Sequence, residues 1–139
     1  MSETGSPMAN PGRWNKLMAV EESDRGLMLD GGEYGLILCP SKYLPEDAEP
    51  GEEFDVFVYF DSKDRIIATT ETPLAQVGEF ACLEVLSVHP KMGAFLDWGL
   101  AKDLLLPFAE QLGRVYEGEK VVVAIQLDRR SSRIIASMK

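Results

Sequence analysis

The sequence predicts an all-β protein made of two small, similar barrels of five strands each. Two observations lead to this fold class. The chain of 139 residues carries the same pattern twice, and each copy alternates short apolar segments with turns rich in glycine, proline and aspartate. A copy spans about 65 residues, a length at which a single domain is small but able to fold.

The internal repeat is clearest when 26-GLMLDGGEYGLILCP-40 is written above 93-GAFLDWGLAKDLLLP-107. The glycine, leucine, aspartate and proline positions then coincide at an offset of 67 residues. One inserted residue brings 65-RIIAT-69 onto 133-RIIAS-137. Because the matches follow one another in order with a single gap, we infer two copies of one module.

The strands follow from apolar periodicity and from the turn residues between them. In the first copy they are predicted at Lys16–Glu22, Gly26–Asp30, Glu33–Pro40, Glu53–Phe60 and Arg65–Thr70. In the second copy they are predicted at Phe80–His89, Gly93–Asp97, Asp103–Leu106, Glu119–Leu127 and Arg133–Ser137. Short helical turns are expected at Ser41 and Phe108, directly after a proline.

Five short strands with a helical turn after the third are typical of a small Greek-key barrel, the OB-fold. A pair of SH3-like barrels is the alternative, which the long connection between the third and fourth strands disfavours. We expect a flexible N-terminal tail over 1–14, a first barrel over 15–73 and a second over 74–139. Thr72-Pro73 is the expected junction, since proline ends the last strand of the first copy.

The excess negative charge lies entirely in the first barrel. Residues 15–73 hold five Lys or Arg against fourteen Asp or Glu, a balance of −9. Residues 74–139 hold eight of each. The net charge of −9 argues against non-specific binding to polyanions by the chain as a whole, and leaves the second barrel as the better candidate.

Composition excludes several classes of protein. The apolar fraction of 45% is typical of a globular chain. The sequence contains no run of eighteen apolar residues, so no membrane span is predicted. The N-terminus lacks the apolar segment of a secretory signal. Cys39 and Cys82 lie in apolar runs, so we expect two reduced core thiols and a cytosolic protein.

No catalytic or metal-binding constellation is evident, and we expect no cofactor. The single histidine, His89, has no Cys or His partner at metal-ligand spacing, and a turn position is the expected role. GxSxG, P-loop and HExxH motifs are absent. The acidic run 46-EDAEPGEEFD-55 lacks the register of a calcium loop.

The stretch 93-GAFLDWGLAK-102 is the main candidate for a binding surface. If Leu96 faces the core, strand alternation places Ala94 and Trp98 on the same side and Phe95 and Asp97 outside. An aromatic ring on the outer face suits base stacking with a single strand. The alternative is a bulge that turns Phe95 into the core.

Other side chains near this strand could take part. Trp98 either caps the barrel interior through its indole N–H or stacks on a ligand. Lys91 and Lys102 flank the strand and could contact phosphate, although each is also an ordinary solvated lysine. The last hairpin turn, 128-DRRSSR-133, adds Arg129, Arg130 and Arg133, while Asp128 could pair with Arg133 and fix the turn.

The segment from Gly93 to Gln111, GAFLDWGLAKDLLLPFAEQ, resembles the conserved virulence factor B family of S1-like RNA-binding proteins. The first copy resembles that family through 58-VYFDSKDRIIATTETPLAQVGEFA-81, and the likeness extends over nearly the whole chain from Trp14. Family members carry successive S1-type OB modules followed by a winged-helix domain. The resemblance implies that this chain matches the first two modules and is a fragment without the C-terminal region.

The resemblance also implies an RNA-binding face in each module. In the second copy its positions fall on Met92, Phe95, Pro107-Phe108, Asp128 and Arg133. Met92 and Pro107 replace the family's aromatic and histidine, so stacking is expected on Phe95, helped by Phe108 or Trp98. In the first copy the positions fall on Arg25, Met28, Pro40, Asp61 and Arg65. The first barrel is therefore expected to bind RNA weakly or to support the second.

We expect a non-enzymatic, cytoplasmic RNA-binding protein. Its second barrel would hold single-stranded RNA on Phe95, with phosphate contacts from Lys91, Lys102, Arg129 and Arg133. A role in post-transcriptional or translational regulation is implied by the family resemblance. The alternative is a protein-interaction module whose acidic first barrel docks on a basic partner in the ribosome or RNA polymerase.

Overall fold

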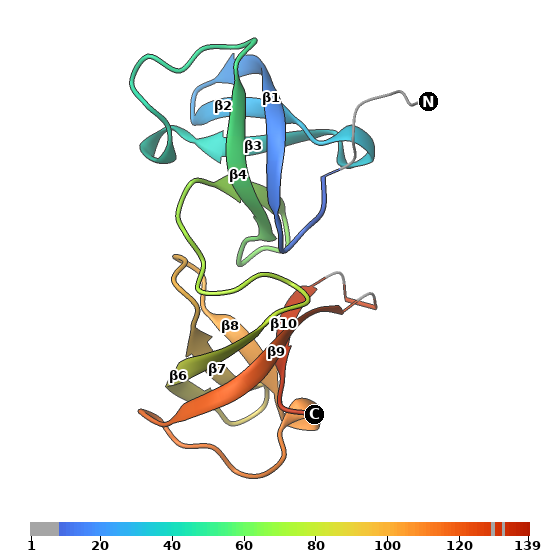
Figure 1. Ribbon diagram of the computed structural model, residues 1–139, viewed down its shortest axis with the longest axis vertical. Coiled ribbons are helices and arrows are strands. Elements are labelled where there is room, and N and C mark those ends of the chain that lie inside the picture. The colour runs from blue at the N-terminus through green and yellow to red at the C-terminus, as the bar shows by residue number, and fades with distance from the viewer. Residues whose placement is uncertain (1–8, 129, 132) are drawn as a thin grey trace. The chain divides into compact units, whose positions relative to one another are not determined.

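The computed structural model describes residues 9–128, 130–131 and 133–139. Over these residues the chain forms strands and short 3-10 turns (Figure 1). It divides into two compact units, Met1–Glu71 and Thr72–Lys139. We call these units barrel 1 and barrel 2. In the described ranges no helix has the length and apolar character that crossing a membrane requires.

Barrel 1 is a closed sheet of five strands in the order β1-β2-β3-β5-β4. Its strands are β1 (Trp14–Ser23), β2 (Gly26–Asp30), β3 (Leu36–Pro40), β4 (Glu53–Phe60) and β5 (Ile66–Thr69). The 3-10 turns η1 (Gly32–Tyr34) and η2 (Ser41–Tyr43) flank β3. β3 and β5 pair in parallel, and the other neighbours pair antiparallel.

Barrel 2 repeats this topology, in the order β10-β8-β7-β6-β9. Its strands are β6 (Phe80–His89), β7 (Gly93–Asp97), β8 (Leu104–Pro107), β9 (Lys120–Asp128) and β10 (Arg133–Ser137), with the 3-10 turn η3 (Phe108–Glu110) after β8. The two closed five-stranded barrels confirm the predicted fold class. The helical turns expected at Ser41 and Phe108 are also present.

A repeated aspartate turn explains part of the sequence repeat. Asp97 accepts a hydrogen bond through Oδ1 from the backbone N–H of Gly99, at 3.0 Å. Asp30 accepts the equivalent bond from Gly32, at 2.9 Å. Both glycines have positive φ, a conformation that other residues rarely adopt. The Asp-x-Gly pattern shared by the two copies therefore builds the turn that follows β2 and β7.

Inward-facing aliphatic side chains fill each barrel. A cluster of buried residues forms the barrel 1 core: Ala9, Leu17, Ala19, Leu27, Leu29, Ile37, Cys39, Val56, Val58 and Ala68. Barrel 2 buries Leu83, Val85, Ala94, Leu96, Trp98, Leu104, Leu106, Val121, Val123, Ile125 and Ala136. Along β2, β3, β8 and β9 the buried residues alternate with the predicted period of two. In β4 the alternation fails, because residues 56–60 are all buried.

The third strand of barrel 1 is shorter than predicted. It begins at Leu36 rather than at Glu33, because η1 occupies residues 32–34 and Gly35 follows with a φ of 74°. The apolar pattern could not separate these residues from the strand, since a 3-10 turn of three residues has no distinct period.

The predicted N-terminal tail over 1–14 is too long, because the chain is already packed at Ala9. The Ala9 side chain belongs to the barrel 1 core, and its N–H donates to the carbonyl of Gly31 at 3.2 Å. Gly12 donates to the carbonyl of Val58 at 2.6 Å. The composition of this segment resembles a linker, and only tertiary contacts hold it.

The two cysteines differ, contrary to the prediction that both lie in the core. Cys39 is buried, and burial raises the pKa of its thiol to about 11. Cys82 is exposed on the outer face of β6, opposite the exposed Val122 of β9. An apolar run cannot distinguish the two faces of a strand when both carry apolar side chains.

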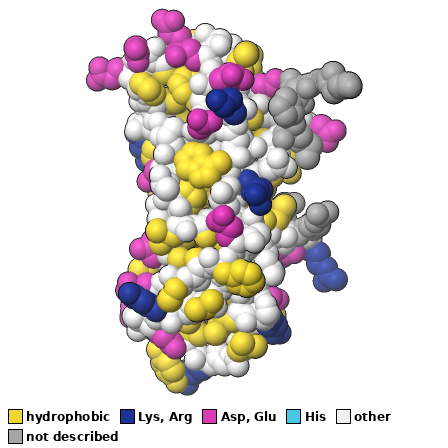
Figure 2. Space-filling model, in the orientation of Figure 1, with side chains coloured by type: hydrophobic (Ala, Val, Ile, Leu, Met, Phe, Trp, Pro, Cys, Tyr) yellow, Lys and Arg dark blue, Asp and Glu magenta, His cyan; other side chains and the backbone are white. Residues whose placement is uncertain are grey.

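Acidic side chains gather at the end of barrel 1 that carries the β1–β2 hairpin and the connection from β3 to β4 (Figure 2). The exposed acidic residues in these segments are Glu21, Glu22, Asp24, Glu46, Asp47, Glu49, Glu52 and Glu53. The charge imbalance seen in the sequence is therefore a surface property of barrel 1.

Candidate nucleic-acid interface

The outer face of β7 carries the candidate stacking residue. Ala94 and Leu96 are fully buried and Trp98 is 2% exposed, whereas Asp97 is exposed and Phe95 is half-buried. This alternation places Phe95 on the outer surface of the barrel, as predicted.

Phe95 lies in an apolar row that crosses three strands. It pairs with Leu105 of β8, and Leu105 pairs with Ile135 of β10. All three residues are half-buried. The irregular register lies in the neighbouring β6, between Val85 and Ser87, so β7 keeps its alternation. The row offers a ring and two aliphatic side chains on one surface.

Trp98 is a structural residue, so the candidate role in stacking on RNA does not fit its position. Its indole Nε1–H donates to the backbone carbonyl of Lys102 at 2.7 Å. With the ring enclosed in the barrel, no face is open to a base. The hydrogen bond closes the loop between β7 and β8, which is the capping role considered from the sequence.

One end of β7 joins the turn that follows β6. His89 accepts hydrogen bonds through Nδ1 from the backbone N–H groups of Lys91 and Met92, at 3.1 and 3.2 Å. Both of these side chains are exposed. Gly93 pairs with Pro107, so Phe108 follows at the same end of the face, with 48% of its surface exposed.

The other end of β7 adjoins Lys102 and the β9–β10 hairpin. β10 runs parallel to β8, with Ile135 opposite Leu105. Arg133 therefore lies near the start of β8, the end that follows Lys102 in the sequence. Arg133 pairs with Asp128 in the ladder, and Asp128 accepts from the N–H of Arg130 at 3.1 Å. Arg129, also a candidate, lies outside the described residues.

Acidic groups share this end of the face. Burial, and then the negative charge of Asp97, raise the pKa of the Asp103 carboxyl above its ordinary value. Lys102 and Arg133 therefore share this end of the face with the carboxylates of Asp97 and Asp103.

Barrel 1 presents a different surface at the equivalent place. Met28 occupies the position of Phe95 and pairs with Leu38, which in turn pairs with Ile67. Glu21 stands opposite Met28, whereas Ser87 stands opposite Phe95. The first barrel thus has the same apolar row without an aromatic ring, and with a carboxylate beside it.

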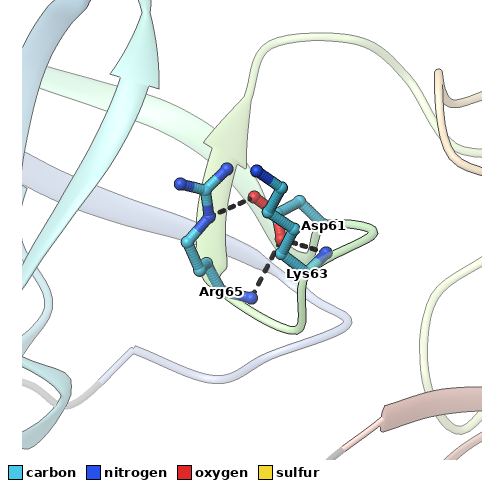
Figure 3. A network of polar contacts seen from close by, with 3 residues as sticks. All are labelled: Asp61, Lys63 and Arg65. Carbon is cyan, nitrogen blue, oxygen red and sulfur yellow. Dashed lines mark hydrogen bonds and ion pairs between the residues drawn. The ribbon is translucent and has the colours of Figure 1, made fainter.

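The last turn of barrel 1 is closed by its own charges (Figure 3). Asp61 accepts through Oδ1 from the N–H groups of Lys63 and Arg65, both at 2.9 Å, and through Oδ2 from Arg65 Nε at 3.0 Å. Burial is the largest single influence and raises the pKa of Asp61, but these hydrogen bonds and the Arg65 charge together lower it. Arg65 is therefore engaged within the turn.

The face presents an apolar ring together with cations, an arrangement suited to a flat apolar group and an anionic backbone. Among the described residues no group of three or more His, Cys, Asp or Glu is arranged to hold a metal ion.

Two residues that sequence reasoning missed are Arg114 and Tyr116. The Arg114 guanidinium lies over the Tyr116 ring, 5.4 Å from its centre. The repeat contained the signal, because the aligned positions in the first copy are Asp47 and Glu49. A comparison of the two copies at exposed loop positions would have singled them out.

Comparison with known proteins places this geometry among S1-like folds. Residues 11–71, which span barrel 1, match the family model described as S1 domain. The chain is 35% identical over 96 residues to the uncharacterized protein YitL of Bacillus subtilis (strain 168), a match that covers 69% of this chain and 32% of that protein.

A solved structure is similar over almost the whole chain. It is a multidomain protein with nucleic acid binding domains from Streptococcus pneumoniae, with a TM-score of 0.75 and 20% identity. The alignment covers 91% of this chain and 45% of that chain. At this identity the likeness supports the fold. The chain spans less than half the length of both of these similar proteins.

Proposed function

We propose that this protein binds single-stranded RNA on the outer face of barrel 2. The observation that carries the proposal is the row of Phe95, Leu105 and Ile135, which holds an aromatic ring on the surface of an OB-fold. Stacking of a base on such a ring contributes about 1–3 kcal/mol and tolerates any base. Lys91, Lys102 and Arg133 are the described cations around the row.

Three observations support this assignment. The S1 domain match covers barrel 1, whose fold barrel 2 repeats. The similar structure from Streptococcus pneumoniae is described as having nucleic acid binding domains. Barrel 2 also has a balanced charge, so phosphate meets no net repulsion there. We infer that Phe108 continues the face beyond β8, and that barrel 1 contributes little to RNA affinity.

The family resemblance leads to a more specific proposal. We infer that the chain corresponds to the first two modules of a virulence factor B protein, and that it acts in the cytoplasm in post-transcriptional or translational regulation. The S1 domain match over residues 11–71 supports this inference.

The direct test is a titration of the full chain with labelled single-stranded RNA. Phe95→Ala is expected to weaken binding by about 5- to 150-fold, which corresponds to loss of one stacked base. Arg133→Ala is expected to weaken binding less. Met28→Ala is the matched control, because it alters the equivalent position of barrel 1. Unchanged affinity in both barrel 2 variants would show that the face is misassigned.

The acidic surface of barrel 1 supports a second candidate function. Eight exposed carboxylates surround its β1–β2 hairpin and β3–β4 connection. Such a field attracts a basic partner, and components of the ribosome or RNA polymerase fit that description. Reversing Asp47 and Glu49 to lysine should abolish capture of such a partner while RNA affinity does not fall. Retained capture would count against this second function.

A further inference from the structure

The connection from β8 to β9 carries surface features that the proposed RNA-binding face does not use. After η3 it covers residues 111–119, the orange segment that leads to β9 in Figure 1. Together with η3 it exposes three large side chains, Phe108, Leu112 and Tyr116. Exposed aromatic rings close together in one short segment call for an explanation beyond folding.

An open cavity lies at the start of this connection. Phe108, Gln111, Gly113 and Arg114 line it, and its volume is about 360 Å³. Gln111 is fixed by its Nε2, which donates to the carbonyl of Leu106 at 3.1 Å. A Cβ at Gly113 would meet no atom within 4 Å, so the wall at that position is open.

Arg114 supplies a positive charge at the cavity. Its guanidinium lies over the ring of Tyr116, a cation–π contact that orients the group. In the described part of the chain Arg114 has no ion pair with a carboxylate. The guanidinium can therefore donate to an anion that enters the cavity.

Two of the three nearby carboxylates have structural partners. Glu110 accepts from the hydroxyl of Ser137 at 2.7 Å, and Glu119 accepts from the N–H of Tyr116 at 2.9 Å. Glu117 is exposed to water, where salt screens its charge. Two of the three acidic groups thus hold the loop in place.

Barrel 1 contains the same turn. Glu52 accepts from the N–H of Glu49 at 2.7 Å, as Glu119 does from Tyr116 in barrel 2. The glycine between them, Gly51 in barrel 1, donates to a β1 carbonyl, just as its barrel 2 counterpart donates to β6. The backbone of the turn therefore does not depend on the exposed side chains.

Those exposed side chains differ completely between the copies. At the offset of 67, Phe108, Arg114 and Tyr116 align with Ser41, Asp47 and Glu49. Two rings and a cation in barrel 2 thus replace a hydroxyl and two carboxylates. Since the fold accepts either set, the aromatic and basic set points to binding.

We propose that the cavity is a nucleotide subsite that extends the RNA-binding face past the end of β8, an inference that rests on the RNA binding proposed above. Arg114 contacts a phosphate, and Phe108 and Tyr116 offer ring faces to the adjoining bases. The pairing of Gly93 with Pro107 brings Phe108 to the end of β7. A bound RNA strand would therefore continue from Phe95 along one surface.

The test is a titration of the full chain with labelled oligouridylate of about twelve nucleotides, within the range that OB-folds occupy. Arg114→Asp and Tyr116→Glu introduce the residues that barrel 1 carries in the same turn, so the fold should be retained. Each is expected to weaken binding by about 5- to 50-fold. Gly113→Leu adds a bulky side chain at the lining of the cavity and should weaken binding similarly.

Salt dependence identifies the phosphate contact. Arg114→Met should reduce the magnitude of the slope of log affinity against log salt by about 0.7, the value for one phosphate of a single strand. Arg114→Lys should keep the slope. Lys120→Met is the matched control, because it removes an exposed cation of the β6–β9 side of the barrel and should leave the slope unchanged.

The Phe95→Ala variant separates this subsite from the proposed function. If Phe95→Ala weakens binding while the Arg114 and Tyr116 variants bind normally, the subsite is wrong and RNA binding stands. The subsite would still be wrong if the Arg114 and Tyr116 variants bound RNA normally but lost binding to a polypeptide partner. If the unaltered chain does not bind the oligonucleotide, both proposals fail. Weaker binding by Arg114→Met with an unchanged slope would contradict the phosphate contact.

Discussion

Glycine positions decide whether two strands can approach each other in each barrel. A Cβ at Gly93 would lie 2.3 Å from the carbonyl oxygen of Leu106, and the φ of Gly93 is 130°. At Gly26 the corresponding distance to the oxygen of Cys39 is 2.1 Å. Both clashes are with backbone atoms, which cannot move aside cheaply. These glycines recur in the two copies because the crossing of strands requires them.

We therefore expect Gly93→Ala to destabilise barrel 2 strongly. Backbone strain and the clash with Leu106 should together lower the free energy of unfolding by about 2–4 kcal/mol, measured by urea denaturation. Gly113→Ala is the control, since its Cβ would meet open space, and its midpoint should hardly move. Equal midpoints for the two variants would contradict the close approach.

The raised pKa of the Asp103 carboxyl leads to a prediction about stability. Burial and the charge of Asp97 raise its pKa in the folded state, so the ionised form destabilises the fold. That destabilisation develops as pH rises from the unfolded pKa through the folded one, and it is complete near neutrality. Asp103→Asn should therefore melt at a higher temperature than the unaltered chain near pH 7.

The difference should vanish at about pH 3 and below, where the carboxyl is protonated in both states. Thermal melts of the two proteins across this range are the measurement. A stability gain that persists in acid would mean that packing, and not charge, explains the substitution.

At the scale of elements, β7 and the loop after it combine two different tasks. Phe95 faces outward in a surface row, while Trp98, three residues later, closes the barrel from inside. The sequence placed both rings near a possible ligand. Alternation correctly separated their faces, but only the hydrogen bond to Lys102 shows why a ring so large lies inside.

Trp98→Phe should separate stability from binding. Loss of the hydrogen bond to the Lys102 carbonyl is expected to cost about 1 kcal/mol, together with some loss of packing. RNA affinity, measured well below the melting temperature, should stay within about twofold, since the indole is 2% exposed. A large loss of affinity without loss of stability would return Trp98 to the binding face.

The helical turns and most strand bounds could be predicted because prolines and apolar alternation mark them. Gly93–Asp97, Phe80–His89 and Glu53–Phe60 have the predicted bounds. The first 3-10 turn of barrel 1, at residues 32–34, could not be predicted, because its residues also continue the strand pattern. Boundaries depend on hydrogen bonds between segments that sequence periodicity does not contain.

For the whole molecule, charge is the property that matters most for RNA binding. Barrel 1 carries the excess of −9, and barrel 2 is balanced. Under the proposed function, attraction to phosphate arises from a few cations at the face of barrel 2, and not from a general positive field. Binding should depend on salt, but less steeply than for a basic protein.

The salt dependence can be stated as a number. With two to four phosphate contacts, the slope of log affinity against log salt should lie between roughly −1.4 and −2.8. Fluorescence titrations at several salt concentrations measure it. A slope near zero would exclude a phosphate-based mode, while one much steeper would require cations beyond those of the face.

The duplication, the all-β class, the charge imbalance and the outward position of Phe95 could all be predicted from the sequence. These follow from periodicity, spacing and composition, which are local properties of the chain. The folded chain was needed to show that Trp98 is enclosed, that Cys82 is exposed and that Ala9 belongs to the core. It also brought Arg114 over Tyr116 beside a cavity. Burial and side-chain partners depend on residues distant in sequence, which no local pattern records.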